Sequence, residues 1–497
     1  ERLGRLRVAG DPAGAVSAAL EASYRALPGE SRRLFRLLGL IPGPEASREA
    51  AAVLLGRPLA DPVPELDELL AAHLIAEPAP DRFRGHDLLA LYARRLAAAE
   101  PEPVRTQALR RLLSWYMLSS GAAMVALYPH RTPGGWGDLE TVSPPHEFDD
   151  PGEARDWLVT ELANLTAATV HTADHGPGSF ACNMAKNLNS FLYARGAGRT
   201  LATVAQAGLR AAEATDDDVG RGHSHMALGM ARTAMGRLRD ATGEFRAAAE
   251  HFRVAGLMYN VRASSGALGD IYIRTGDIAR AAELLDQRLD PAAPSEADKF
   301  TLVNLCTTSR IRGEYADALR QGAASRALAV RAGLPSLIAT ADIALAHVHL
   351  ALGDPAAAEP LLLSAHVGAG EVAGEIDVYD ALAGLVLVCA RTGRHEEAAT
   401  WAAGLEKLLE RGVTSGSGDD WAHAAIVEAH LGSGRPERAV AAGSPAVDEH
   451  ERIGRRLAAM RLRVLLGQAR AALGEVAAAR GLWETAMAYA TEQQLPD

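Results

Sequence analysis

A glycine that recurs at nearly constant intervals constrains the fold of this chain more than any other feature. In the second half of the sequence, seven such glycines are each followed five positions later by an alanine. The pairs are Gly236/Ala241, Gly276/Ala281, Gly313/Ala318, Gly353/Ala358, Gly393/Ala398, Gly434/Ala439 and Gly474/Ala479. Subtracting the numbers of successive glycines gives spacings of 40, 37, 40, 40, 41 and 40. Gly196 precedes Gly236 by the same interval and fits an earlier, degenerate unit.

Each of these glycines follows an apolar stretch with helical spacing, such as SHMALGMARTAMG. Glycine adopts the left-handed conformation that ends many helices. The small alanine on the next helix lets the two helices pack closely. One unit is therefore a helix, a tight turn and a second helix, and such units must stack because none buries its apolar face alone. The spacing predicts about seven clear repeats and one or two irregular ones between residues 155 and 490.

The repeated pattern resembles tetratricopeptide repeats with longer connections. We therefore predict a mainly α fold, in which a small winged-helix domain is followed by an α-solenoid of about seven to nine tetratricopeptide-like helical hairpins. Stacks of this kind have concave grooves that hold a protein, a peptide or sometimes a small ligand. The candidate groove residues on first helices are Asn260, Arg262, Asn304 and Arg310. The alternative is that several of them are only solvated surface residues.

The first hundred residues have a different pattern, which predicts a winged helix. Apolar spacing predicts helices at 17–28, 31–40, 45–56 and 63–75, and IAEPAPDRFRGH reads as two short strands. The segment 61–74, which would enter a DNA groove, carries four carboxylates and no Arg or Lys. Carboxylates repel phosphates, so the pattern favours a domain-to-domain role over DNA binding by this domain.

Two stretches of this region, LEASYRALPGESRRLFRLLGLIPGPEAS and LDELLAAHLIAEPAPDRFRGHDLLALYARRLA, carry a family resemblance. They resemble the winged-helix region of bacterial signal-transducing NTPases with numerous domains, in particular the actinobacterial antibiotic regulatory proteins of the AfsR type. The segment 147–176 resembles the part of those regulators that leads into their repeats. The resemblance implies four parts: a tail of a preceding helical NTPase subdomain at 1–16, a winged helix at 17–100, a helical linker with a Gly/Pro-rich loop at 101–154, and a repeat superhelix at 155–497.

The resemblance also gives a role to the His-Asp pair in DRFRGHDLLALYARR. From the residues alone, Asp87 would cap a helix from Leu88 to Leu96, and His86 would be an ordinary structural histidine. The family motif is Met-His-Asp, and this chain departs from it only at Gly85. In that family the histidine contacts the β-phosphate of ADP. The resemblance therefore implies that His86 and Asp87 are the nucleotide-sensing residues.

The chain lacks the sequence that would bind the nucleotide itself. Its three lysines are followed by Asn187, Phe300 and Leu408, so it has no Gly-Lys-Ser/Thr of a P-loop. We therefore expect no cofactor in this chain, ADP or ATP in a longer protein, and no enzymatic activity here. The resemblance implies the sensor and switch region of an ATP-dependent transcription regulator. Its partners would be a protein, peptide or small signal in the repeat groove, the protein's own NTPase domain, and DNA and RNA polymerase through other domains.

Two other functions stay open at this point: the same region of a defence or signalling NTPase, and a free-standing repeat scaffold. Three distant cysteines and a net charge of −11 fit a cytoplasmic protein that is neither disulfide-stapled nor a general nucleic-acid binder. No apolar run reaches membrane-spanning length, and no membrane partner is expected. A Gly/Pro-rich loop is expected at 128–145, and SGSGDD at 415–420 reads as an ordinary connection.

Histidine pairs are the remaining candidates for a metal site. His171 and His175 are four residues apart and can share a helix face, but a third ligand is missing from the pattern, so no metal is expected. The pairs His223/His225 and His347/His349 are two residues apart and point to different faces, as surface or packing residues do. Four tryptophans in helical patterns are expected to be packing anchors: Trp115, Trp157, Trp401 and Trp483.

Overall fold

The computed structural model describes residues 20–128, 144–286, 299–372, 375–413, 415 and 420–495. The expected tail at 1–16, nearly all of the loop at 128–145 and four residues of SGSGDD lie outside these ranges. The chain forms two compact units. The N-terminal unit comprises residues 1–127, 131–187 and 210–215, and the repeat unit comprises residues 128–130, 188–209 and 216–497.

The N-terminal unit begins with a winged helix. After a helical segment at 20–26, its elements are α2 (Gly29–Leu38), β1 (Ala46–Ser47), α3 (Arg48–Leu55), α4 (Pro64–Ala71), β2 (Ala76–Ala79), β3 (Arg82–Arg84) and α5 (Asp87–Ala98). Strand β3 lies between β1 and β2 and is antiparallel to both. The four helices expected between residues 17 and 75 and the hairpin are found. Strand β1 was not predicted, because two residues are too few to show alternation.

Local chemistry sets the ends of these elements. The Ser47 hydroxyl accepts a hydrogen bond from the Ala50 amide at 3.1 Å and caps α3, and Gly56, with φ 76°, ends it. On α4, Glu65 is buried and forms a two-pronged pair with Arg57, at 2.9 and 2.6 Å. One of the four carboxylates expected to face a DNA groove is therefore neutralised inside the fold.

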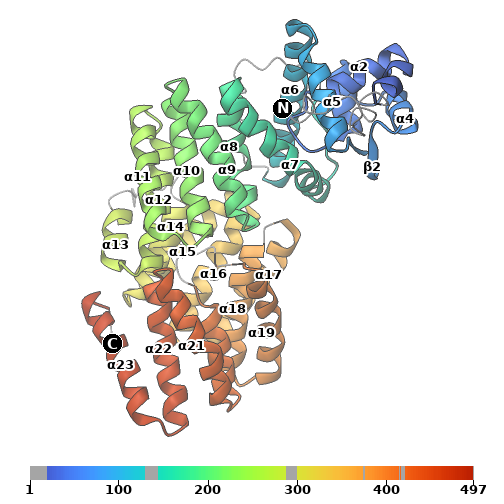
Figure 1. The fold of residues 1–497 in the computed structure, drawn as a ribbon. Coiled ribbons are helices and arrows are strands. Elements are labelled where there is room, and N and C mark those ends of the chain that lie inside the picture. The colour runs from blue at the N-terminus through green and yellow to red at the C-terminus, as the bar shows by residue number, and fades with distance from the viewer. Residues whose placement is uncertain are drawn as a thin grey trace. The chain divides into compact units, whose positions relative to one another are not determined.

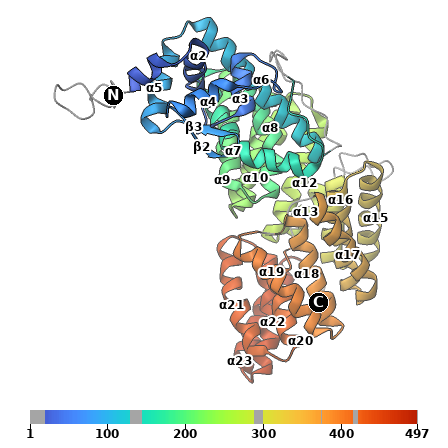
Figure 2. The ribbon, with the colours of Figure 1, turned by 90° about the vertical axis from the view of Figure 1, so that its right-hand side faces the viewer.

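The winged helix is fixed to two long helices of the same unit, α6 (Glu102–Leu127) and α7 (Pro151–His175). The buried Arg111 of α6 donates hydrogen bonds to the Val53 and Leu54 carbonyls at the end of α3, at 2.9 and 2.5 Å. The buried Arg82 of β3 pairs with Glu161 of α7. In Figure 2, strands β2 and β3 lie beside α7.

The rest of the chain consists of helical hairpins (Figure 1). Their bounds are α8 (Gly178–Ala194), α9 (Gly198–Ala214), α10 (Asp218–Ala234), α11 (Leu238–Val254), α12 (Met258–Thr275), α13 (Ile278–Asp286), α14 (Lys299–Ile311), α15 (Tyr315–Arg331), α16 (Pro335–Ala351), α17 (Pro355–Val372), α18 (Glu375–Arg391), α19 (His395–Glu410), α20 (Ala422–Gly432), α21 (Pro436–Arg452), α22 (Arg456–Ala472) and α23 (Val476–Glu492). Within the described residues these helices form eight successive pairs, as the predicted fold class requires.

The glycine and alanine register is confirmed position by position. All seven turn glycines, and Gly196 as well, have positive φ. All seven alanines are fully buried. Glycines within first helices also permit close packing: a Cβ on Gly269 would lie 2.6 Å from Leu285 of the paired helix. The expected physical basis, a left-handed turn and a small contact face, is what builds each hairpin.

The last hairpin of the repeat unit contacts a much earlier one. Helices α12 and α22 touch, and Ile278, Leu457 and Tyr489 form one buried cluster. The Tyr489 hydroxyl donates a hydrogen bond to the Gly276 carbonyl at 3.0 Å. First helices α12, α14, α16, α18, α20 and α22 each contact the next, and α22 contacts α12, so they surround a common interior. Within the described residues, no helix is long and apolar enough to cross a membrane.

Candidate functional site

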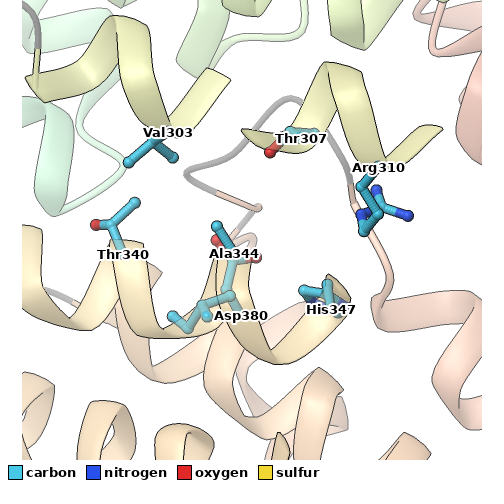
Figure 3. A pocket seen from close by; sticks show the side chains of 8 residues that line it. Val303, Thr307, Arg310, Thr340, Ala344, His347 and Asp380 are labelled. Carbon is cyan, nitrogen blue, oxygen red and sulfur yellow. The ribbon is translucent and has the colours of Figure 1, made fainter. Parts of the chain in front are cut away.

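The repeat unit contains a small cavity between three first helices, with room for about one or two water molecules. Helix α14 supplies one wall, α16 the facing wall and α18 one residue, as Figure 3 shows. The residues that line the cavity are Val303, Thr307, Arg310, Thr340, Ile343, Ala344, His347 and Asp380. Arg310, His347 and Asp380 are each more than nine-tenths buried. Burying charged groups costs free energy even when they are paired, so this lining is unusual for simple packing.

Trp421 lies next to the cavity and contacts two of the polar residues that line it, Arg310 and His347. The guanidinium of Arg310 lies 5.4 Å from the centre of the Trp421 ring, and that of Arg461 lies 3.3 Å from it. The His347 ring stacks on the same indole at 5.0 Å with an interplanar angle of 13°. An indole face attracts cations, and the attraction strengthens when water is excluded. Trp421 therefore connects α14, α16 and α22.

The neighbouring Asp420 is a buried carboxylate with three donors. It accepts hydrogen bonds from the Tyr379 hydroxyl at 3.3 Å and the Ala422 amide at 3.1 Å, and it pairs with the buried Arg455. Burial alone would raise the pKa of this carboxyl, but the charge of Arg455, the nearby histidines and the Ala422 amide hold that pKa below its usual value. Asp420 is therefore ionised, and the donors around it are arranged to bind an anion.

The connection between α19 and α20 also reaches α12. Arg274 of α12 is 2% exposed, pairs with Asp270 at 2.6 Å and donates to the Ser415 carbonyl at 3.1 Å. Ser415, Asp420 and Trp421 together touch α12, α14, α16 and α18, as well as α22 and the residue that precedes it. The expectation that SGSGDD is an ordinary connection is therefore wrong for its described residues, because Ser415 and Asp420 are both buried.

The four predicted groove residues lie in different surroundings. Arg310 lines the cavity. Asn304 donates a hydrogen bond from its side-chain amide to the Gly266 carbonyl at 3.0 Å and so links α14 to α12. Asn260 and Arg262 are half-buried in the first part of α12, outside the cavity lining. His347, expected to be a surface or packing residue, is buried and packs on Trp421, and it also lines the cavity.

Several residues of this site were missed by the sequence analysis, although the repeat register marks them. One position, at a constant distance before the turn glycines Gly353, Gly393, Gly434 and Gly474, holds Thr340, Asp380, Trp421 and Arg461 in that order. Thr340 and Asp380 line the cavity, and Arg461 contacts the Trp421 indole and the Asp420 carbonyl. The available signal was that three of these positions, Thr340, Asp380 and Arg461, hold a polar residue where a helix in a stack is expected to be apolar.

The second candidate position is the start of α5 in the N-terminal unit. The helix begins at Asp87, and His86 occupies the N-cap position without a capping hydrogen bond from its side chain. The predicted capping role of Asp87 is therefore wrong, since Asp87 is the first residue of the helix. Both side chains are exposed. A Cβ on Gly85 would lie 3.2 Å from the Ala90 amide nitrogen, so this turn is tight for the Met of the family motif.

The start of α5 can supply one donor to a phosphate. An exposed imidazole beside a helix N-terminus is a suitable phosphate contact. The first-turn carboxylate of Asp87 partly opposes this.

His171 and His175 stack at 4.5 Å on α7, and the described residues contain no group of three or more potential ligands for a metal ion.

Comparison with known proteins adds sequence and fold relatives. The tetratricopeptide repeat family model matches residues 263–287, 339–364 and 380–403. The regulatory protein AfsR of Streptomyces coelicolor is 38% identical over 173 residues, which are 33% of this chain and 17% of that protein. AfsR of Streptomyces griseus is 37% identical over 172 residues, with 32% and 17% covered. The match thus spans about a sixth of the length of these curated relatives.

Two solved structures share the fold. A signal transduction ATPase with numerous domains and a tetratricopeptide repeat sensor, from Pyrococcus horikoshii, has a TM-score of 0.53 at 12% identity and covers 94% of this chain and 64% of its own. A Rap protein complexed with competence and sporulation factor has a TM-score of 0.51 at 13% identity, with 69% and 93% covered. In sequence the chain thus resembles AfsR-type regulators, and in fold it is a mainly α solenoid of tetratricopeptide-like hairpins.

Proposed function

We propose that this chain is the sensor and switch region of an ATP-dependent transcription regulator. The similarity to AfsR and the fold shared with a tetratricopeptide sensor support a regulatory sensor region. Beyond that, we infer that the repeat unit binds a peptide or protein signal and that the winged helix gates nucleotide exchange in an NTPase domain outside this chain. The domain boundaries given above belong to the same proposal.

The observation that carries the sensor role is the buried, charged interior of the repeat unit. A solenoid that only spaces other domains has no need of Arg310, His347 and Asp380 around a cavity, since apolar residues would stabilise it as well or better. Charged groups held inside a groove favour selection of a partner with matching charges. The Rap protein that shares this fold is complexed with competence and sporulation factor, which supports binding of a ligand by the repeat unit.

The switch role rests on the N-terminal unit. His86 is exposed at the start of α5, where its ring can donate to a phosphate oxygen. The winged helix is bound to α7 through the buried pair of Arg82 and Glu161. A shift of α7 would therefore carry β3 with it, and β3 ends two residues before His86. When bound, ADP would supply the phosphate that this histidine holds.

The test is ADP retention by the full-length protein. The variant His86→Ala should lose bound ADP faster than wild type, by at least about tenfold, because a charge-assisted hydrogen bond contributes about 1.5–3 kcal/mol. The matched control is Arg95→Ala, an exposed residue in the last turn of the same helix. Equal nucleotide content and equal basal transcription in wild type and both variants would contradict the switch role of His86.

A further inference from the structure

Asp420 is buried and Trp421 is half-buried among residues of the first helices. They come from a connection between two helices, yet their side chains contact residues on or directly before four first helices: Arg310, His347, Tyr379, Arg455 and Arg461. By contrast, the first helices α10, α12, α16 and α22 each begin only a few residues after the preceding helix ends. This pair is therefore an internal occupant of the repeat interior.

The helix that follows this connection is shorter than its equivalents. Helices α16, α18 and α22 each have 17 residues, whereas α20 has 11 and begins at Ala422. At the register position of Trp421, three other repeats have Thr340, Asp380 and Arg461, all within helices. Trp421 instead stands at the N-cap of α20, with its indole against the cationic groups of two other helices.

The groups that surround Asp420 and Trp421 indicate which chemical groups this site accepts. The Arg455 guanidinium, the Tyr379 hydroxyl and the Ala422 amide surround a carboxylate. The guanidinium groups of Arg310 and Arg461, with the His347 ring, surround an aromatic face. Most of these groups lie on helices other than α20, so they are supplied by the solenoid and would also meet any segment that enters from outside.

We propose that Asp420 and Trp421 occupy the ligand site of the repeat unit, and that its ligand is an acidic peptide that places an aromatic side chain and a carboxylate on the same partners. This rests on the proposed function only in taking the ligand to be a peptide. Binding then requires displacement of the internal pair. A tethered segment competes at about millimolar effective concentration, so it weakens the apparent affinity of a free peptide.

The experiment supplies the internal segment from outside. A fluorescein-labelled peptide with the sequence SGSGDDWAH, residues 415–423, is titrated with the full chain carrying Asp420→Ala and Trp421→Ala together. Fluorescence anisotropy should show binding at least about tenfold tighter than to the wild-type chain, whose site is filled. A control peptide with Asn and Ala in place of the Asp-Trp pair should bind the double variant no better than it binds wild type.

Two further variants keep the result interpretable. Circular dichroism and thermal unfolding check that the double variant folds, and Trp421→Leu, which keeps an apolar side chain and Asp420, replaces it if it does not. Adding Arg461→Ala to the double variant should abolish peptide binding. If both peptides bind the folded double variant equally weakly, the proposal is overturned and Asp420 and Trp421 have a structural role. Because no nucleotide is present, this result is independent of the His86 test.

Discussion

Tyr489 in the last helix donates its hydroxyl hydrogen bond to the carbonyl oxygen of Gly276, 213 residues earlier in the chain, at 3.0 Å. This contact, with the cluster of Ile278, Leu457 and Tyr489, joins the C-terminal hairpin to the turn between α12 and α13. An open solenoid has contacts only between neighbouring repeats. Here a contact between distant repeats fixes the interior that contains Asp420 and Trp421.

The variant Tyr489→Phe should therefore weaken this closure. It leaves the buried Gly276 carbonyl without the hydroxyl and should lower the free energy of unfolding by about 1–2 kcal/mol. Urea unfolding of the full chain measures the change. Tyr259→Phe, on an exposed tyrosine of the same unit, is the control and should change stability by less than about 0.5 kcal/mol. Equal stability of wild type and Tyr489→Phe would show that the contact contributes nothing.

The pair between Arg82 and Glu161 should be the strongest single link between the winged helix and α7. Both side chains are buried, and Asn164 also donates to Glu161 at 2.7 Å. Burial raises the pKa of Glu161 even beside Arg82. The variant Glu161→Gln leaves a buried guanidinium with only Glu45 as a charged partner, and should cost about 3 kcal/mol.

Tryptophan fluorescence reports this change, since Trp115 and Trp157 meet edge-to-face at 6.0 Å in the same unit. The control is Asp156→Asn, an exposed carboxylate on the same helix, which should be close to neutral. If Glu161→Gln unfolds at the same urea concentration as Asp156→Asn, the pair does not hold the winged helix in place.

His450 predicts a loss of stability in acid. Burial lowers the pKa of this imidazole to about 4, with Asp420 opposing and His423, Arg455 and Glu449 also nearby. Because the folded-state pKa lies below the unfolded value, the native state binds fewer protons between pH 6.5 and 4. The contribution of neutral His450 to the free energy of unfolding, up to about 3 kcal/mol, is complete above pH 6.5 and is lost as the pH falls to 4. Replacing His450 by Gln should flatten the pH profile of the free energy of unfolding in that window.

Asp377 predicts the opposite dependence in the same unit. Burial raises the pKa of its carboxyl to about 6, although the hydroxyls of Ser336 and Thr340 donate to it at 2.7 and 3.3 Å. The native state therefore holds a proton that the unfolded chain has lost, and stability falls as the pH rises from about 4 to 6. Asp377→Asn should raise the melting temperature at pH 8 and leave it nearly unchanged at pH 4. If Asp377→Asn raises the melting temperature equally at the two pH values, the raised pKa of Asp377 is refuted.

The fold was largely predictable, since its determinants are local. A turn glycine and a buried alanine five residues later recur in seven of the eight hairpins, and both are visible in one sequence. Strand β1 was not, because a two-residue strand is defined by its partner Phe83 and not by its own pattern. The choice between His86 and Asp87 as N-cap also depends on backbone angles that neither residue type determines.

The interior site was predictable only in part. Arg310 was selected because it lies on a first helix, and it does line the cavity. Asp420 and Trp421 were missed because a Gly/Ser-rich connection has no periodicity from which to infer burial. Contacts such as that of Arg274 with Ser415, 141 residues apart, depend on how the stack curves, which no local pattern encodes.

The central claim is that the repeat interior controls nucleotide exchange at the winged helix. The most direct measurement is the rate of ADP release from the full-length protein carrying Trp421→Ala, compared with wild type and with Trp483→Ala, a tryptophan on the last helix outside the site. The account predicts release at least about tenfold faster for Trp421→Ala alone, because removal of the internal occupant mimics the signal. Equal release rates for all three proteins, with Trp421→Ala still folded, would contradict it.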